Sequence, residues 1–386
     1  MTRQPFHPAP PAPRAVSAGV GAHPSLVSDT AAAGHAFASA VACLRPWVVG
    51  GAWACVLLLL AAYPLAPLFF NQWQFVPFIV GMVFLGLPHG AMDHLVVPFD
   101  KGRPLTAVYF ALFFSGYLGL TLAYLAFWHA LPTLALGVFL VMSWLHWGQG
   151  DAWARHVFFG RPAPTSRVRA GLVWAVRGAL PIILPPLAFP AVFQSFTQGM
   201  LTWYGLGNQQ WTLTLPVRIA GFGVLGVLAA CYAWAAWREG GPNQRRAFWA
   251  DMFEVCLLAV LFVRVPPILA VGAYFCVWHA VRHIARLMLL DPVAQTWLAE
   301  GRLGRSIART ARLSLPLTLA ALALLGGLYA FQPHRAADAG SFVYFYLSLI
   351  AALTFPHFLL VLWMDRRLKL SETAESPPAP ILGSRI

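Results

Sequence analysis

Long apolar runs separated by short polar connections dominate the chain from about residue 47 to residue 364. A run of about 20 apolar residues is long enough to cross the hydrocarbon core of a bilayer as a helix. The pattern therefore predicts an all-α polytopic membrane helical bundle of about ten transmembrane helices, with eight as the lower limit. The ten runs are approximately 47–69, 74–99, 105–128, 131–150, 168–190, 213–237, 247–264, 266–290, 313–332 and 341–364.

The run 247–264 is the weakest of the ten, because it is short and contains Asp251 and Glu254. Residues 1–45 are rich in Pro, Ala and Ser and contain no apolar run, so we expect a disordered cytoplasmic tail there. Residues 366–386 are expected to form a second disordered cytoplasmic tail. The transmembrane domain then covers residues 46–365.

Two connections are more than turns. The segment 191–212 is uncharged and semi-polar, which predicts a segment lying against the outer surface. The segment 293–312 carries arginines at helical spacing, which predicts an amphipathic helix on the inner leaflet. These arginines are Arg302, Arg305, Arg309 and Arg312.

Composition supports a membrane protein, because charged residues make up 10% of the chain and hydrophobic residues 59%. The formal charge of +13 would favour nucleic-acid binding in a soluble protein, but here the basic residues gather in short connections. Connections after the even-numbered runs carry most of them, whereas connections after the odd-numbered runs carry only Arg264 and Arg335. This asymmetry excludes a nucleic-acid partner and predicts a cell inner (cytoplasmic) membrane protein with both termini in the cytoplasm.

Candidate chemistry centres on histidines within the apolar runs. His279 and His283 are four residues apart, so on a helix both imidazoles face the same side and can bind one metal ion. His89, His146 and His357 lie in the C-terminal halves of other even-numbered runs, which places all five at one depth. A histidine inside a bilayer is costly, so this layer predicts a functional site.

Neutral imidazoles suit Fe, Cu, Zn or Ni, and an open metal position beside an apolar cavity favours redox or oxygen chemistry on a lipid-soluble substrate. Asp93 lies one turn beyond His89 and is expected to orient an imidazole ligand. For Asp151, a charge at the helix end near the interface is the favoured interpretation. Four other histidines are expected outside the site: His94, His129, His156 and His334.

Four motifs in order resemble those of the Brp/Blh family of β-carotene 15,15′-dioxygenases. The resemblance covers roughly residues 75–365. The motifs are Pro88-His89-Gly90-Ala91-x-Asp93, His146-Trp147-Gly148-x-x-Asp151, Trp278-His279-x-x-Arg282-His283 and Pro356-His357.

The resemblance implies that residues 46–365 form a catalytic domain, which cleaves the central double bond of β-carotene with O₂ to give two all-trans-retinal molecules. It also implies a non-haem Fe(2+) cofactor, with His89, His146, His279 and His283 as the metal ligands. Delivery of the retinal to a microbial rhodopsin is a candidate fate of the product. His357, which shares the depth of these ligands, is expected to assist catalysis beside the metal without binding it, together with Asp93.

Three other functions remain open on the residues alone. A membrane desaturase or hydroxylase would need more histidines for two irons and usually contains adjacent His-His pairs, which the sequence lacks. A haem-binding membrane cytochrome would use two histidines and leave the others unexplained. A transporter would need polar residues across the whole bilayer, whereas the outer halves of the even-numbered runs are almost wholly apolar.

Extended β-carotene is about as long as the hydrocarbon core is thick, ~30 Å. Because the histidine layer lies toward the cytoplasmic face, central cleavage requires the substrate to lie obliquely or flat in a tunnel that opens sideways to lipid. Gly90 and Gly148 are expected to leave room for it beside the ligands.

Overall fold

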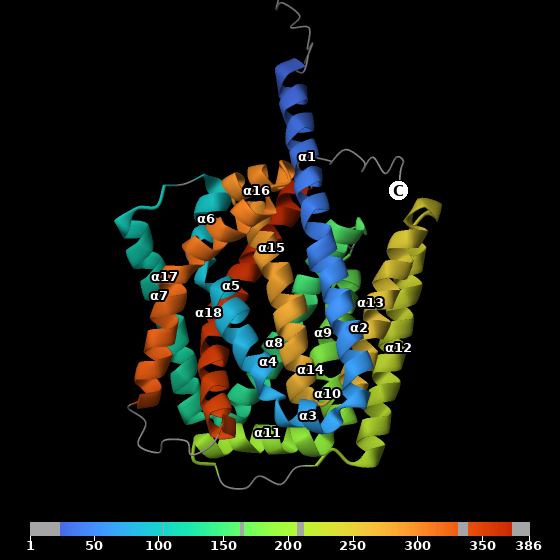
Figure 1. Cartoon of the computed structure of the whole chain (residues 1–386), viewed down its shortest axis with the longest axis vertical. Coiled ribbons are helices and arrows are strands. Elements are labelled where there is room, and N and C mark those ends of the chain that lie inside the picture. Colours follow the sequence, from blue (N-terminus) through green and yellow to red (C-terminus); the bar gives the residue numbers. More distant parts are fainter. Residues whose placement is uncertain (1–23, 103, 163–165, 207–211, 331–338, 373–386) are drawn as a thin grey trace, which may run out of the picture.

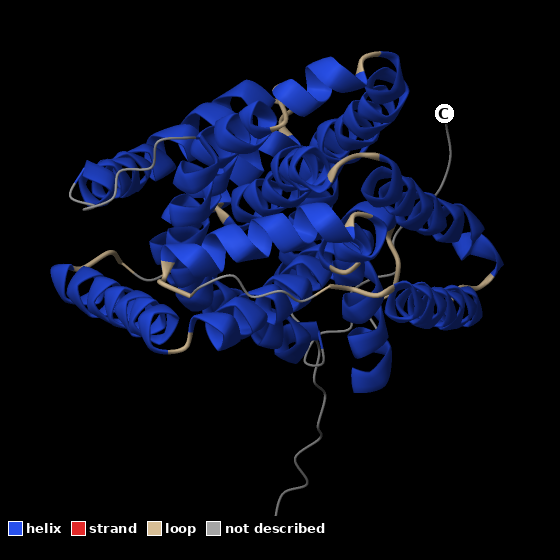
Figure 2. Ribbon diagram, turned by 90° about the horizontal axis from the view of Figure 1, so that it is seen from below, coloured by secondary structure: helices blue, strands red, loops and turns tan. Residues whose placement is uncertain are grey.

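The computed structural model describes residues 24–102, 104–162, 166–206, 212–330 and 339–372. These residues form a bundle of helices joined by short loops, and no strand occurs among them (Figure 2). The prediction of an all-α membrane helical bundle is confirmed.

The first half of the chain forms helices over each of the expected runs. They are α1 (Pro24–Arg45), η1 (Pro46–Gly51), α2 (Ala52–Ala62), η2 (Tyr63–Leu65), α3 (Pro67–Gln72), α4 (Phe75–Gly81), η3 (Met82–Gly86), α5 (Leu87–Ala91), α6 (Asp93–Lys101), α7 (Ala107–Ala130), α8 (Pro132–Phe159), α9 (Arg167–Ile182), α10 (Leu184–Ala188) and α11 (Pro190–Trp203).

The second half continues the same pattern. Its helices are α12 (Leu215–Glu239), η4 (Pro242–Gln244), α13 (Arg245–Arg264), α14 (Pro267–Tyr274), η5 (Phe275–Ala280), α15 (Val281–Leu290), α16 (Pro292–Ala299), α17 (Leu303–Ala330) and α18 (Ala339–Glu372). Helix α1 begins and α18 ends at the same end of the bundle, and α11 lies crosswise over the opposite end (Figure 1).

The expected number of membrane spans is wrong. Among the described residues, seven segments, not ten, are long and apolar enough to cross a membrane. The runs absent from the seven correspond to α8, to α9 with α10, and to α13. Polar side chains within these helices, many of them buried, lower the mean hydropathy, and Pro181 and Pro185 fall where α9 gives way to α10.

Two expected segments, the N-terminal tail and 293–312, also differ in extent. Residues 24–45 of the expected N-terminal tail are helical, and Ala40 and Leu44 are buried in an apolar cluster with Met288 of α15 and Leu298 of α16. Residues 1–23 lie outside the described residues. In place of one amphipathic helix over 293–312, the chain turns at Gly301, where φ is 74°, between the short α16 and the long α17.

The segment 191–212 is mostly helical, and the helix before the expected C-terminal tail extends into that tail. Most of 191–212 is the crosswise helix α11, as expected for a surface segment, and residues 207–211 lie outside the described part. Residues 366–372, expected in the C-terminal tail, continue α18, and 373–386 are not described.

Glycines bring the helices that carry the site into close contact. A Cβ atom added to Gly148 on α8 would lie 2.2 Å from the backbone oxygen of Trp174 on α9. A Cβ on Gly178 of α9 would lie 1.9 Å from the backbone oxygen of Trp144 on α8. Gly148 therefore lies at a close contact between α8 and α9. The expectation that it leaves room for substrate beside the candidate ligands is wrong.

Gly148→Ala should destabilise the protein by about 1–3 kcal/mol, because the added methyl group forces the backbones of α8 and α9 apart. Thermal unfolding in detergent or nanodiscs measures the effect. Gly171→Ala on α9 is the matched control, because no atom lies within 4 Å of its added Cβ. Equal unfolding temperatures for the two variants would contradict this account of the α8–α9 contact.

Candidate metal centre and substrate cavity

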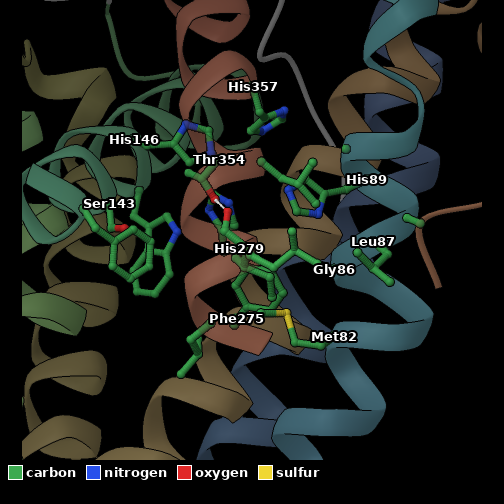
Figure 3. A pocket seen from close by; sticks show the side chains of 18 of the residues that line it. Met82, Gly86, Leu87, His89, Ser143, His146, Phe275, His279, Thr354 and His357 are labelled. Atoms are coloured by element: carbon green, nitrogen blue, oxygen red, sulfur yellow. Dashed lines mark hydrogen bonds between the residues drawn. The ribbon is translucent and has the colours of Figure 1, made fainter. Parts of the chain in front are cut away.

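Five histidines from separate parts of the chain converge inside the bundle. They are His89 on α5, His146 on α8, His279 on η5, His283 on α15 and His357 on α18, each with 8% or less of its surface exposed. Figure 3 shows that the labelled side chains of four of them approach a common space from different helices. The chain therefore gathers, within its apolar interior, the residue type that most often binds transition metals.

The spacing of the rings suits one shared metal ion. The ring centroid of His357 lies 5.1 Å from that of His89, 4.9 Å from that of His146 and 5.0 Å from that of His283. The centroid of His279 lies 5.8 Å from that of His89 and 5.0 Å from that of His146. A ligating imidazole has its centroid roughly 3 Å from the metal, so ligand rings around one ion lie roughly 4.5–6.5 Å apart.

Several ring nitrogens in this cluster have no protein partner. Within the described part of the chain, both nitrogens of His146 and the Nε2 atoms of His283 and His357 are buried without a hydrogen bond. Buried polar atoms rarely stay unpaired, and a bound cation satisfies imidazole lone pairs directly. These donors therefore fit a metal ion of the kind that prefers neutral nitrogen ligands.

Asp93 reaches the cluster through His357. The Nδ1 atom of His357 lies 2.8 Å from Oδ2 of Asp93, and the Tyr117 hydroxyl donates to the same oxygen at 3.1 Å. Tyr117 also lies 3.2 Å from the backbone oxygen of Leu353 on α18. A carboxylate at Nδ1 fixes the imidazole tautomer and leaves Nε2 facing the cluster. Asp93, His283 and His357 offer ligand atoms within 4.8 Å of one another, so this buried group could bind a metal.

Irregular helical turns set the direction in which the side chains of two candidate metal ligands point. The π-helical segment η3 ends three residues before His89, and the π-helical segment η5 contains His279. A wide π turn shifts the side chains that follow it relative to an unbroken α-helix, and such turns occur frequently at functional sites. The two segments are in close contact, because a Cβ on Gly86 of η3 would lie 2.7 Å from the ring of Phe275 of η5.

The structure places the other predicted residues as follows. His94 was expected outside the site, but its side chain lines the cavity described below, with its ring 5.9 Å from that of Phe114. His129 packs against Tyr204, and Nδ1 of His156 lies 2.8 Å from the backbone oxygen of Arg161, both away from the cluster. His334 lies outside the described residues.

An apolar cavity of about 640 Å³ runs past the histidines. Its lining residues include Phe113 and Phe114 of α7, residues of α17, Pro185 of α10 and Phe193 of α11. His89, His146, His279 and His357 also line the cavity, whereas His283 is not among its lining residues. An apolar molecule in this cavity would therefore lie beside the metal-binding cluster. A Cβ on Gly90 would meet no atom within 4 Å, as expected for a residue that leaves room in the wall.

Comparison with known proteins gives a consistent result. A sequence model of the family described as beta-carotene 15,15′-dioxygenase matches residues 80–365. The chain belongs to the β-carotene 15,15′-dioxygenase family. The match includes every histidine of the cluster and Asp93.

The sequences of curated relatives align with most of this chain. The chain is 35% identical over 293 residues to a probable beta-carotene 15,15′-dioxygenase Blh of Halobacterium salinarum, which covers 76% of this chain and 85% of the relative. It is 25% identical over 307 residues to Brp of the same species, covering 75% of this chain and 83% of the relative. A beta-carotene 15,15′-dioxygenase of an uncultured marine bacterium is 24% identical over 280 residues, covering 72% and 90%. No solved structure matches the chain.

Beside the histidine cluster, this family member contains a buried network of ion pairs that the sequence analysis missed. Arg177 on α9 donates to Asp151 at 3.1 Å and to Glu254 at 2.9 Å, and it also pairs with Asp251. Arg282, between His279 and His283 in sequence, donates to Asp151 at 2.9 Å and pairs with Glu254. All five side chains are at most 2% exposed.

The network corrects the interpretation of Asp151 as a helix-end charge. Asp151 also accepts a hydrogen bond from Nε1 of Trp278 at 3.1 Å, so it joins the helix of His146 to the segment that carries His279 and His283. Asp251 and Glu254, which made the run 247–264 the weakest prediction, are the carboxylates that neutralise the arginines. Arginine at a spacing of three from His279 was the one available signal of this contact.

Glu254→Gln should destabilise the protein by about 3–5 kcal/mol, because it leaves Arg177 and Arg282 with too little negative charge in a site without water. Unfolding in nanodiscs tests this. Asp100→Asn removes an exposed carboxylate and serves as the control, with a change expected below about 0.5 kcal/mol. A loss no larger for Glu254→Gln than for this control would refute the role of the network.

Proposed function

We propose that this protein cleaves the central 15,15′ double bond of β-carotene with O₂ and releases two molecules of all-trans-retinal. The proposed cofactor is a non-haem Fe(II) inside the membrane, held by His89, His146, His279 and His283. The observation that carries the proposal is the buried histidine cluster on the wall of an apolar cavity, in a chain that belongs to this family.

The stoichiometry suits a site with a metal and no organic cofactor. One C=C bond of the substrate and the O–O bond break, and each oxygen atom becomes the aldehyde oxygen of one product. No external reductant is needed, because the two bonding pairs of the C=C bond and the two of O₂ together make the four bonding pairs of the two new C=O bonds, and the alkene carbons are the formal reductant of O₂. When bound, Fe(II) with neutral ligands supplies an open position for activation of O₂.

The side chains of this protein have three proposed roles. Phe113, Phe114 and Phe193, which line the cavity, exclude water and hold the polyene by apolar contact. The histidines on the cavity wall select the bond that reacts, because the bond nearest to the metal is the one cleaved. The His357–Asp93 pair provides a fixed imidazole beside the open position, and Tyr117 holds the Asp93 carboxylate.

The helices that line the cavity support an oblique substrate. They include α7 and α17 on one flank of the bundle and α10 and α11 near the end that α11 crosses (Figure 1). We propose that β-carotene enters from lipid between the flanking helices, and that the protein lies in the cell inner membrane with both termini in the cytoplasm. Delivery of retinal to a microbial rhodopsin is part of the same proposal.

Expression in β-carotene-producing cells should convert the carotenoid to retinal. His279→Ala should abolish retinal formation and lower the bound iron, because the apolar surroundings offer no replacement ligand. Retinal in the cell extract and iron in the purified protein are the two measurements. His129→Ala, away from the cluster, is the control and should retain both. Full iron content in the His279→Ala protein would refute the ligand assignment.

His357→Ala should reduce cleavage roughly 10- to 100-fold with iron retained by the four proposed ligands, because it removes the imidazole that Asp93 holds beside the cluster. Iron content and initial cleavage rate are measured on the same preparation. The Asp93→Asn variant should show a smaller loss in the same direction, since the imidazole remains. Iron loss equal to that of His279→Ala would instead make His357 a fifth ligand.

Gly90→Leu should reduce turnover roughly 100-fold and leave the iron content unchanged, because its side chain would enter the open space beside His89 and displace the substrate. Gly90→Ala should have a smaller effect, in proportion to the added volume. If Gly90→Leu turned over β-carotene at the normal rate, the cavity would not be the substrate site.

A further inference from the structure

The hydroxyl groups on the wall of the apolar cavity beside the histidines differ in one respect. Four of the described lining residues carry a hydroxyl, namely Tyr117, Thr121, Ser143 and Thr354. Tyr117 donates to Asp93, and Thr121 donates to the backbone oxygen of Tyr117 at 2.9 Å. Thr354 donates to the backbone oxygen of Ile350 at 2.7 Å. Within the described part of the chain, only the Ser143 hydroxyl makes no hydrogen bond.

The Ser143 hydroxyl is nevertheless open to the cavity. The residue is 4% exposed and lies on the cavity wall. Unlike the hydroxyl of Tyr274, which is sealed inside the protein without a partner, the Ser143 oxygen keeps accessible surface. A serine within a helix often donates to the backbone oxygen one turn earlier, which here belongs to Phe139. Because Ser143 does not do so, its proton is available to a molecule in the cavity.

Ser143 lies close to the proposed metal site. It precedes His146 by three residues on α8, so the two residues are ~4.5 Å apart along the helix axis, with roughly 5–6 Å between their Cβ atoms. Figure 3 shows both residues on one flank of the space that the histidines approach. An oxygen atom that forms beside the cluster is therefore within a short movement of the Ser143 hydroxyl.

The chemistry of this donor distinguishes the product of the proposed reaction from its substrate. β-Carotene is a hydrocarbon and has no atom that accepts a hydrogen bond. Retinal is a hydrocarbon polyene that ends in one aldehyde oxygen, which is a good acceptor. A single donor in an otherwise apolar cavity orients a ligand of this kind.

We propose that Ser143 donates a hydrogen bond to the aldehyde oxygen of one retinal molecule in the main cavity. The proposal rests on the proposed function for the source of the aldehyde. The hydrogen bond becomes possible only when an oxygen atom has joined the polyene, so it stabilises the product without strengthening the binding of β-carotene. Since no other lining hydroxyl of the described chain is free, the two retinal molecules are held unequally, and the one at Ser143 leaves last.

The test measures the binding of retinal and of β-carotene to the purified protein in phosphatidylcholine nanodiscs without O₂, where no cleavage occurs. Binding is followed by quenching of tryptophan emission, to which Trp147 on the cavity wall contributes, and nanodiscs without protein give the background. Ser143→Ala should weaken retinal binding roughly five- to tenfold and change β-carotene binding by less than about twofold. Ser143→Thr should bind retinal normally, because it keeps the hydroxyl.

Raman spectra of the bound retinal give a second measurement that a purely structural role of Ser143 would not alter. Loss of the hydrogen bond should raise the C=O stretching frequency in Ser143→Ala and leave it unchanged in Ser143→Thr. Thr121→Val is the matched control, because it removes a cavity hydroxyl that is already bonded within its own helix. It should change neither the two affinities nor the stretching frequency.

Two results would overturn the proposal. One is an equal retinal affinity and stretching frequency for Ser143→Ala and the unaltered protein. The other is an equal loss of retinal and β-carotene binding in Ser143→Ala, which would show that the residue only supports the cavity wall. Retinal binding that depends on Ser143, in a protein that makes no retinal in cells, would overturn the proposed function and leave this contact intact.

Discussion

Polar groups inside the bundle have to find partners within the chain, and the rest of the structure depends on this constraint. The carboxylates of Asp151, Asp251 and Glu254 pair with Arg155, Arg177 and Arg282 inside the bundle. If these helices packed in another arrangement, a buried pair would break and leave an uncompensated charge. This cost favours one arrangement of the helices. Several ring nitrogens of the histidine cluster are buried without a partner in the described part of the chain, and because they lie together on imidazoles that converge they indicate a ligand.

The sequence predicted helices well and membrane spans less well. Every apolar run is helical, because the length and apolar character of a run depend only on local sequence. Helices α8 and α13 fall outside the seven apolar spans because their polar residues lower the mean hydropathy, and α9 is only 16 residues long. Many of these polar residues are paired with one another across helix boundaries, which hydropathy does not register. The same limit affects the charge count, since Arg155 follows the fourth run and Arg286 lies near the end of the eighth, but both are buried partners of carboxylates.

The candidate site shows the same division between local and distant information. The spacing of His279 and His283 and the order of the motifs brought the five histidines together as candidates. The pairing of His357 with Asp93 joins residues 264 positions apart, which no local pattern could predict. Gly148 shows the converse, because a glycine beside a motif histidine appeared to leave room for substrate and instead permits contact with Trp174.

The central claim is that buried imidazoles from separate helices hold one iron ion. X-ray absorption at the iron edge of the purified, anaerobically prepared protein tests it most directly. The account predicts one iron per chain, with nitrogen atoms in the first coordination shell and the outer-shell scattering of several imidazole rings. A first shell that contains sulfur, an iron–iron distance, or protein that is active and free of iron would contradict it.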